Sequence, residues 1–194
     1  MDQLPLVLLL QIAEYSVETW KSFVSAHPRV GRWSLQPEYQ KYIQRKYTKC
    51  IEYQRNDGII RKYKLCNKRH NVDGPAVEYA DGTREWWLNG RRHRDNDLPA
   101  VECASGTKFW YKNGKVHRDG DLPAGEYASG AKEWYKNGKF HRDDDLPAVE
   151  YVDGSKFWYK NGLYHRDNDF PAIEYSNGHK KWYRDGRRYF PAGR

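Results

Sequence analysis

The sequence predicts a mainly β protein in which tandem 24-residue repeats of β-hairpins form an open sheet or solenoid behind a small N-terminal α-helical head. Three observations carry this prediction. The second half of the chain repeats with a period of 24, each repeat holds two dipeptides typical of tight turns, and 15% of the residues are aromatic. A fixed period indicates units that bury surface against their neighbours. The aromatic content favours strands and argues against disorder, although only 38% of the residues are hydrophobic.

The repeat divides the chain into three predicted parts. Residues 71–194 hold five units, such as the one that starts at Pro99 (PAVECASGTKFWYKNGKVHRDGDL). Residues 48–70 form a basic junction and a degenerate first unit, and residues 1–47 have apolar residues at helical spacing and form the head. One tryptophan stands at the same place in every unit. We predict that these residues form a scaffold ladder: Trp86, Trp110, Trp134, Trp158 and Trp182.

Two turn signals in each unit predict two hairpins. The first is an Asp-Gly, Ser-Gly or Asn-Gly pair at residues 81–82 and the equivalent positions, and the second is an Asn-Gly or Asp-Gly pair at residues 89–90 and the equivalent positions. Such pairs suit type I′ turns, because both central residues of that turn need positive φ. Two-residue loops at both turns set Val77 opposite Trp86, and Trp86 opposite His93.

Strand parity in this register separates two faces of the sheet. One face repeats almost unchanged between units: Val or Ile, Tyr, Lys or Arg, Trp, and His. The other face varies. The Glu85 position reads Glu, Phe, Glu, Phe, Lys through the five units, and the Arg92 position reads Arg, Val, Phe, Tyr, Arg. The register also sets Glu78 opposite Glu85, an unfavourable pair. We expect the varied face to bind a partner through six aromatic anchors: Phe109, Tyr111, Phe140, Phe157, Tyr159 and Tyr164.

The net charge of +8 is concentrated in the junction. Residues 41–70 hold 10 basic and 2 acidic groups, whereas residues 71–194 hold 21 basic and 20 acidic groups. The nearly neutral array argues against nucleic acid bound along it, and the junction leaves nucleic acid or anionic membrane as an alternative partner. The apolar runs fall far short of a transmembrane helix, and three widely spaced cysteines favour a soluble, intracellular protein.

Three motifs raise the question of chemistry. His-Arg-Asp, which occurs in kinase catalytic loops, recurs in four units without a glycine-rich loop or Asp-Phe-Gly. Equivalent histidines of successive units are expected ~10 Å apart, too far for one zinc ion. The Asp pairs that follow could offer carboxylates to calcium, but turn formation and pairing with neighbouring Arg explain them more simply. We therefore expect structural histidines, and no enzyme activity, metal or cofactor.

The units resemble MORN-type repeats, because Tyr-x-Asp-Gly-x-Lys-x-Trp-Tyr-x-Asn-Gly-Lys-x-His is similar to the strand-turn-strand core of that family over roughly residues 50–190. The Arg-Asp-x-Asp-Leu-Pro-Ala stretch after the His replaces the glycine-rich stretch of the family. The N-terminal pattern resembles an F-box in these residues: Leu4, Pro5, Leu8, Leu9, Ile12, Trp20 and Trp33. F-box-like starts joined to variant MORN-like arrays resemble proteins of giant DNA viruses of the Marseillevirus group.

These resemblances imply an F-box-type substrate adaptor. The head would bind the Skp-type adaptor of a cullin ubiquitin ligase, and the repeats would bind the target. The adaptor-binding residues implied by the resemblance are Leu4, Pro5, Leu8, Leu9 and Ile12. A viral protein of this kind is expected in the host cytoplasm or the virion, and the main alternative is a structural virion or assembly protein.

Overall fold

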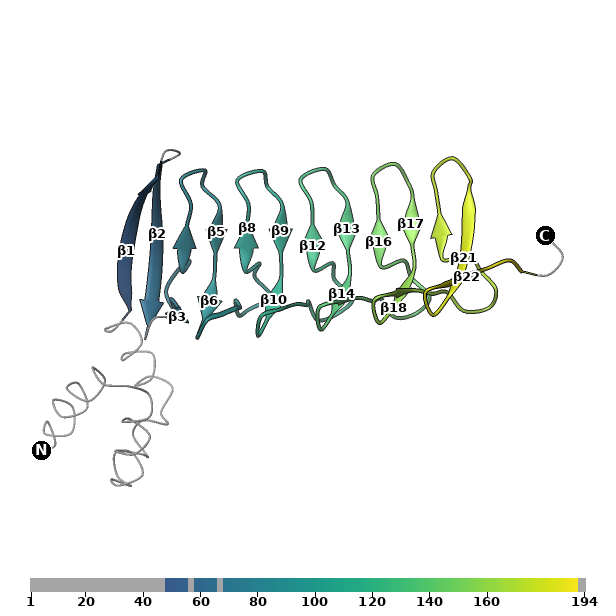
Figure 1. Cartoon of the computed structure of the whole chain (residues 1–194), viewed down its shortest axis with the longest axis horizontal. Coiled ribbons are helices and arrows are strands. Elements are labelled where there is room, and N and C mark those ends of the chain that lie inside the picture. The colour runs from purple at the N-terminus through teal and green to yellow at the C-terminus, as the bar shows by residue number, and fades with distance from the viewer. Residues whose placement is uncertain (1–47, 56–57, 66–67, 192–194) are drawn as a thin grey trace, which may run out of the picture.

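The structure is a computed structural model that describes residues 48–55, 58–65 and 68–191, and every regular element in these residues is a β-strand. Figure 1 shows one long open sheet that runs from β1 at one end to β22 at the other. The predicted repeat of hairpins in an open antiparallel sheet is confirmed. The predicted helical head, with its five adaptor-binding candidates, lies outside the described residues.

The sheet begins with a long hairpin and continues with one short hairpin per unit. Its strand order is β1-β2-β4-β5-β8-β9-β12-β13-β16-β17-β20-β21-β22, with β3 paired to β2. In the first four units a second pair of strands forms a separate two-stranded ribbon: β6-β7, β10-β11, β14-β15 and β18-β19. In the last unit β21 serves both purposes, since it pairs with β20 and with β22.

The strand bounds follow the 24-residue period. The junction holds β1 (Lys49–Arg55), β2 (Gly58–Leu65) and β3 (Lys68–Arg69). The first two units hold β4 (Val77–Glu78), β5 (Arg84–Glu85), β6 (Trp87–Leu88), β7 (Arg91–Arg92), β8 (Val101–Glu102), β9 (Lys108–Phe109), β10 (Tyr111–Lys112) and β11 (Lys115–Val116). The last three hold β12 (Gly125–Glu126), β13 (Lys132–Glu133), β14 (Tyr135–Lys136), β15 (Lys139–Phe140), β16 (Val149–Glu150), β17 (Lys156–Phe157), β18 (Tyr159–Lys160), β19 (Leu163–Tyr164), β20 (Ile173–Glu174), β21 (Lys180–Arg184) and β22 (Arg187–Tyr189).

The predicted register of the first hairpin is wrong by one residue. Val77 lies opposite Glu85, not Trp86. The Tyr79 N–H donates to the Thr83 carbonyl at 2.9 Å, so the loop has three residues and only its last, Gly82, has positive φ. This is a type I turn followed by a left-handed glycine. In the first unit it is stabilised because the Thr83 N–H donates to Oδ1 of Asp81, at 2.8 Å.

The second hairpin has the predicted type I′ turn. Asn89 and Gly90 both have positive φ, of 50° and 80°, and Trp86 lies opposite His93, whose N–H donates to the Trp86 carbonyl at 3.1 Å. The glycine N–H of each such turn also donates to the preceding unit, as from Gly114 to the Arg92 carbonyl at 2.8 Å. The ribbons are therefore hydrogen-bonded to one another along the array.

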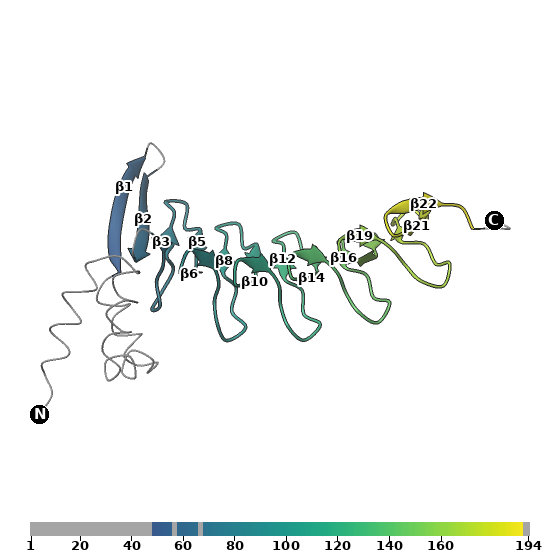
Figure 2. The same ribbon diagram turned by 60° about the horizontal axis from the view of Figure 1, so that its bottom comes forward.

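The core is thin and repeats with the units. Most units bury one Ala, one Val or Ile, and one Trp, for example Ala148, Val149 and Trp158 at 0%, 2% and 5% exposure. Figure 2 shows the same elongated array turned, with loops at regular intervals along one side. A core so thin explains the low hydrophobic fraction, because both faces of the sheet keep solvent contact.

One transverse row alternates in charge across the whole array. Glu78 lies opposite Arg84, which lies opposite Glu102, and the alternation continues with Lys and Glu as far as Lys180. Opposite charges on directly paired strands are favourable. The one-residue shift of the first hairpin therefore removes the Glu78–Glu85 clash that the predicted register contained. The alternation of acidic and basic residues in this row also explains why the array is nearly neutral.

Candidate functional site

The two faces of the sheet differ in composition from those predicted, because the register shift moves Val77 and Tyr79. The tryptophan face carries Trp86, His93, Arg94, the alternating charged row and their equivalents in each unit. The aromatic face carries Val77, Tyr79, Glu85, Trp87, Arg92 and their equivalents, since residues paired directly across strands share a face. The contacts of each face indicate what it does.

On the tryptophan face four of the five ladder tryptophans are covered by an arginine. The Arg142 guanidinium carbon lies 3.8 Å from the ring centroid of Trp134, and the same contact measures 3.7–3.9 Å in the other three units that have it. Trp134 Nε1 donates to the Asp121 carbonyl at 3.1 Å. Arg142 also pairs with Asp121 of the preceding loop and with Glu150 of the next hairpin. Arg118, Arg142 and Arg166 each tie three consecutive segments together around a buried ring in this way.

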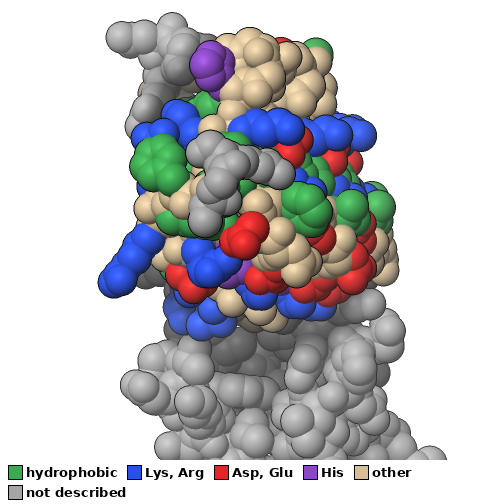
Figure 3. Space-filling view, turned by 90° about the vertical axis from the view of Figure 1, so that its right-hand side faces the viewer, with side chains coloured by type: hydrophobic (Ala, Val, Ile, Leu, Met, Phe, Trp, Pro, Cys, Tyr) green, Lys and Arg blue, Asp and Glu red, His purple; other side chains and the backbone are tan. Residues whose placement is uncertain are grey.

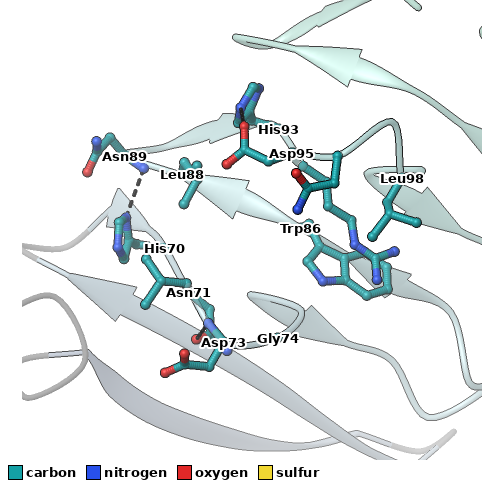
Figure 4. A pocket seen from close by; sticks show the side chains of 13 residues that line it. His70, Asn71, Asp73, Gly74, Trp86, Leu88, Asn89, His93, Asp95 and Leu98 are labelled. Atoms are coloured by element: carbon teal, nitrogen blue, oxygen red, sulfur yellow. Dashed lines mark hydrogen bonds and ion pairs between the residues drawn. The ribbon is translucent and has the colours of Figure 1, made fainter. Parts of the chain in front are cut away.

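The repeated histidines hold successive units in place. His93 Nδ1 accepts the backbone N–H of Asn113 at 3.2 Å, and its Nε2 contacts Asp95 at 2.9 Å. The same pair of contacts recurs at His117, His141 and His165. In the junction, His70 accepts the N–H of Asn89 at 3.0 Å (Figure 4). The predicted structural role of the His-Arg-Asp motif is confirmed by these bonds.

His70 differs from the other histidines because it is fully buried. Its burial lowers the pKa of the imidazole below its ordinary value, while the bond from Asn89 opposes that shift in part. Its Nε2 has no partner among the described residues. It borders a recess of about 520 Å³ that Trp86, Leu88, His93 and Leu98 also line. Similar recesses recur between later units and contain the same His, Arg and Asp side chains, already paired with one another.

The aromatic face carries a row of planar side chains along the ribbons, which we call the aromatic column. Within a ribbon, Tyr159 stacks on Tyr164 with ring centroids 4.2 Å apart. Between ribbons, Phe140 stacks on Tyr159 at 4.9 Å and Tyr164 meets Tyr183 at 5.2 Å. The column consists of Trp87, Arg92, Tyr111, Val116, Tyr135, Phe140, Tyr159, Tyr164, Tyr183 and Arg188. Its rings are half-buried, so part of each remains exposed to solvent.

A second aromatic row lies beside the column on the main sheet. Phe157 makes edge contacts with Tyr151, Tyr164 and Tyr175, at centroid distances of 5.2, 6.3 and 5.7 Å. Phe109 makes the equivalent contact with Tyr127 at 5.5 Å. Edge-to-face pairs add to the stability that burial gives. Together the two rows make a half-exposed aromatic surface over units two to five, and its stacking is unbroken from Tyr135 to Tyr183.

Two glutamates also lie on the aromatic face, Glu85 in the first unit and Glu133 in the third, and their environments differ. Glu85 is buried at 6% exposure, where it accepts a bond from Trp87 Nε1 at 2.8 Å and pairs with Arg92 at 2.9 Å. Glu133 is half-buried and accepts bonds from the hydroxyls of Tyr127 and Tyr135, both at 2.9 Å and both at Oε2. Burial, and then the Glu133 carboxylate, raise the pKa of both tyrosines well above the ordinary value, so both hydroxyls stay protonated donors.

All six predicted anchors lie on the aromatic face and are half-buried. The interpretation missed Trp87, Glu133 and the tyrosines at the Tyr79 position, of which Tyr151 is the most exposed at 45%. The repeat alignment contained the signal for two of these, because Trp87 aligns with the anchors Tyr111 and Tyr159, and Glu133 aligns with Phe109 and Phe157. The register error had assigned the Tyr79 position to the other face. The tryptophans of the predicted ladder are buried except at the last unit, where Trp182 is half-buried.

The described part of the chain offers no group of three or more His, Cys, Asp or Glu side chains arranged to hold a metal ion. No helix long and apolar enough to cross a membrane occurs in residues 48–55, 58–65 or 68–191. Viewed from the C-terminal end of the array, basic and acidic side chains are interspersed over the surface (Figure 3).

Fold and site together define a class: a tandem β-hairpin repeat protein with an open sheet, one face closed by paired polar groups and the other aromatic. The short hairpins are compatible with a MORN-like repeat. Comparison with known proteins found no matching family model, no similar curated protein and no similar solved structure. The function is therefore inferred from the geometry of the two faces.

Proposed function

We propose that this chain is a non-enzymatic scaffold that binds a protein partner on its aromatic face. The observation that carries the proposal is the aromatic column, a row of half-exposed rings stacked over several units. Rigid aromatic side chains that stay partly exposed contribute contact area at small entropic cost, and tyrosine and tryptophan are enriched in protein-binding hot spots. The tryptophan face offers less, because most of its rings are covered and its repeated Arg and His side chains are already paired with Asp and Glu.

The charges of the aromatic face favour a protein over a nucleic acid. Single-stranded nucleic acid binds where aromatic rings alternate with unpaired basic groups. Here Glu85 and Glu133 lie among the rings, and Arg92 is paired with Glu85. In the basic junction, Arg61 is paired with Glu52 at 2.8 Å and Arg69 lies over Trp87 at 4.6 Å. Nucleic-acid or anionic-membrane binding through the junction therefore remains the weaker proposal.

Site-specific photo-crosslinking tests the proposal. A photoreactive amino acid replaces Tyr159 on the aromatic face or Lys156 on the tryptophan face, in the full chain in the cells that produce it. We expect one protein partner to crosslink at position 159 and not at 156. A partner that crosslinks only at 156, or equally at both positions, contradicts the proposal.

The finer identity of the chain is a further part of the proposal. We propose that the repeats are of the MORN type and that the head is an F-box-like segment that recruits a Skp-type adaptor through Leu4, Pro5, Leu8, Leu9 and Ile12. Purified adaptor should bind the full chain and lose binding when Leu8 and Leu9 are both replaced by Asp. Val152→Asp, at a loop position in the array that is 68% exposed, is the matched control and should bind normally. Equal binding by both variants removes the ligase role.

The virion alternative predicts a different observation. A structural or assembly protein of a giant virus would be abundant in purified particles, whereas a substrate adaptor acts in the host cytoplasm. Quantitative mass spectrometry of particles and of infected-cell cytoplasm separates the two roles.

A further inference from the structure

The aromatic column has one interruption, at Val116. Val116 pairs with Tyr111 across the second ribbon, and its carbonyl accepts the N–H of Gly138 from the third at 2.8 Å. It therefore lies between Tyr111 and Tyr135, at the position where other units place Arg92, Phe140, Tyr164 or Arg188. Because valine has no planar group, the stacking present on either side does not continue across this position.

In the first unit the equivalent position holds Arg92, and the column is continuous there. Arg92 lies between two rings, with its guanidinium carbon 5.0 Å from the Trp87 centroid and 5.4 Å from the Tyr111 centroid. Its Nη2 donates to Oε1 of Glu85 at 2.9 Å. The Arg92 guanidinium is thus stacked between two rings and paired with Glu85, which lies two residues before Trp87 in the sequence. This arrangement is an internal template for recognition of an arginine.

The third unit repeats the acceptor of this template without the cation. Glu133 stands at the position of Glu85, two residues before Tyr135, but no Lys or Arg of the described residues lies within 4 Å of its carboxylate. Both tyrosine hydroxyls donate to Oε2, and Oε1 accepts no bond from a described residue. Among the side chains that the structure describes, only His70 Nε2 and Arg92 Nε are buried without a hydrogen-bond partner, so Oε1 keeps contact with solvent.

Gly125 positions this carboxylate. Four units have Val or Ile at this place in the main sheet, and the third has glycine. A Cβ there would lie 3.3 Å from Phe109 Cε1 and 3.4 Å from Oε2 of Glu133. Glycine therefore lets Phe109 and Glu133 lie close over the strand. The departures at positions 125 and 133 are therefore in contact, and Val116 lies between Tyr111 and Tyr135, the rings that follow Phe109 and Glu133 by two residues.

We propose that this spot, which we call the Val116 gap, binds an arginine side chain of a protein partner. The guanidinium stacks between Tyr111 and Tyr135 over Val116 and donates to Oε1 of Glu133. Glu133 precedes Tyr135, the ring of the following unit, whereas Glu85 precedes Trp87, the ring of the same unit as Arg92. The charge is complementary, because the gap holds one carboxylate and no cation of its own. A lysine would satisfy the charge but not the stacking, since its ammonium is not planar. The inference rests on the proposed function, for which it names the chemistry of the partner.

The test uses a defined probe, the blocked pentapeptide Gly-Gly-Arg-Gly-Gly, with citrulline and lysine versions as controls. Citrulline keeps the planar shape of arginine and removes its charge. The full chain, with isotope-labelled tyrosine, is titrated and followed by NMR through the ring signals of Tyr111 and Tyr135. We expect these two rings to shift with the arginine peptide, and at least tenfold weaker binding of the citrulline and lysine peptides.

Three variants locate the site. Glu133→Gln should weaken binding of the arginine peptide at least tenfold. Val116→Arg should abolish it, because the new arginine fills the gap from within as Arg92 does. Glu126→Gln, in the same unit but on the tryptophan face, is the matched control and should bind like the wild type. Equal binding of the arginine and citrulline peptides, or undiminished binding by Glu133→Gln, overturns the proposal.

The two proposals fail separately. A partner that crosslinks at position 159 with the same yield in the wild type, Glu133→Gln and Val116→Arg leaves the binding function standing and removes the arginine site. Absence of any crosslink at 159 removes the binding function itself. Loss of the crosslink in both gap variants, with the Glu126→Gln yield retained, supports both.

Discussion

The tryptophan face and the aromatic face are built from the same strands, yet they differ in how regularly their polar groups are paired. On the tryptophan face a ring, a guanidinium, an imidazole and two carboxylates recur with nearly identical distances, and each has a partner in a neighbouring segment. On the aromatic face the residues change from unit to unit, the rings are half-exposed, and Glu133 has no cation. The difference separates stability from recognition.

The comparison shows how a thin sheet can carry both tasks. A unit buries too little apolar surface to fold alone, so the bonds between units must come from a face that repeats without variation. Once that face holds the array together, the other face is free to vary. We therefore expect substitutions on the tryptophan face to act on the free energy of unfolding, and those on the aromatic face to act on binding.

The largest effect on stability is expected for Trp134→Ala. The ring is 6% exposed, covered by Arg142 and hydrogen-bonded to the Asp121 carbonyl. Removing a buried tryptophan costs about 3–5 kcal/mol. Urea denaturation followed by circular dichroism measures the loss, and Trp182→Ala, at the half-buried end of the ladder, should lose clearly less. A loss below about 1 kcal/mol at Trp134 would show that the face does not hold the array together.

Arg142→Lys should cost about 2 kcal/mol. Lysine keeps the charge but loses the planar stack on Trp134 and the two parallel bonds to Asp121, at 2.8 and 3.0 Å. The same denaturation assay measures the effect. Lys132→Arg, an exposed control on the same face, should change the free energy of unfolding by less than about 0.5 kcal/mol. Equal losses in the two variants would contradict a role for guanidinium geometry.

His70 makes stability depend on pH. Its burial lowers the imidazole pKa in the folded protein, so below the unfolded value of about 6.5 the unfolded chain binds the proton more readily. The contribution of neutral His70 is fully present above that pH and is lost as the pH falls toward the folded pKa. Denaturation midpoints at pH 7.5 and 5.0 should differ more for the wild type than for His70→Gln. The same difference in both proteins contradicts the assignment to His70.

Tyr159→Ser should have the smallest effect on stability, about 1 kcal/mol, although the ring stacks on Phe140 and Tyr164. It is half-buried, so its loss leaves no closed cavity. Denaturation of the variant beside Trp134→Ala compares the two faces directly. A loss as large as that at Trp134 would mean that the aromatic column is core and not a binding surface.

Much of the fold follows from the sequence because turn chemistry and period are local signals. Asn89-Gly90 specifies its type I′ turn. The equivalent turn of the next unit is bonded by a repeated histidine, because the Asn113 N–H donates to His93 Nδ1. The first turn was mispredicted because Asp-Gly also suits a three-residue loop, where the Asp81 side chain caps the Thr83 N–H. No local pattern distinguishes these two loops from each other.

The contacts of the site are harder to predict because they join residues of different units. Arg142 and Asp121 are 21 positions apart, and the Val116 gap brings together variations from two units. The substitutions at positions 116 and 133 are visible in the sequence as departures from the repeat. Both already lie on the varied face in the predicted register, but that register assigns Gly125, which lets Glu133 lie over the strand, to the other face. The sequence alone therefore does not combine the three positions into a site.

The separation of the two faces is tested most directly by the affinity of the crosslinked partner for two matched double variants. One replaces Tyr135 and Tyr159 with Ser on the aromatic face, and the other replaces Lys132 and Lys156 with Ser on the tryptophan face of the same two units. We predict at least a tenfold rise in Kd for the tyrosine variant and less than a twofold change for the lysine variant. A larger loss of affinity in the lysine variant would contradict the account.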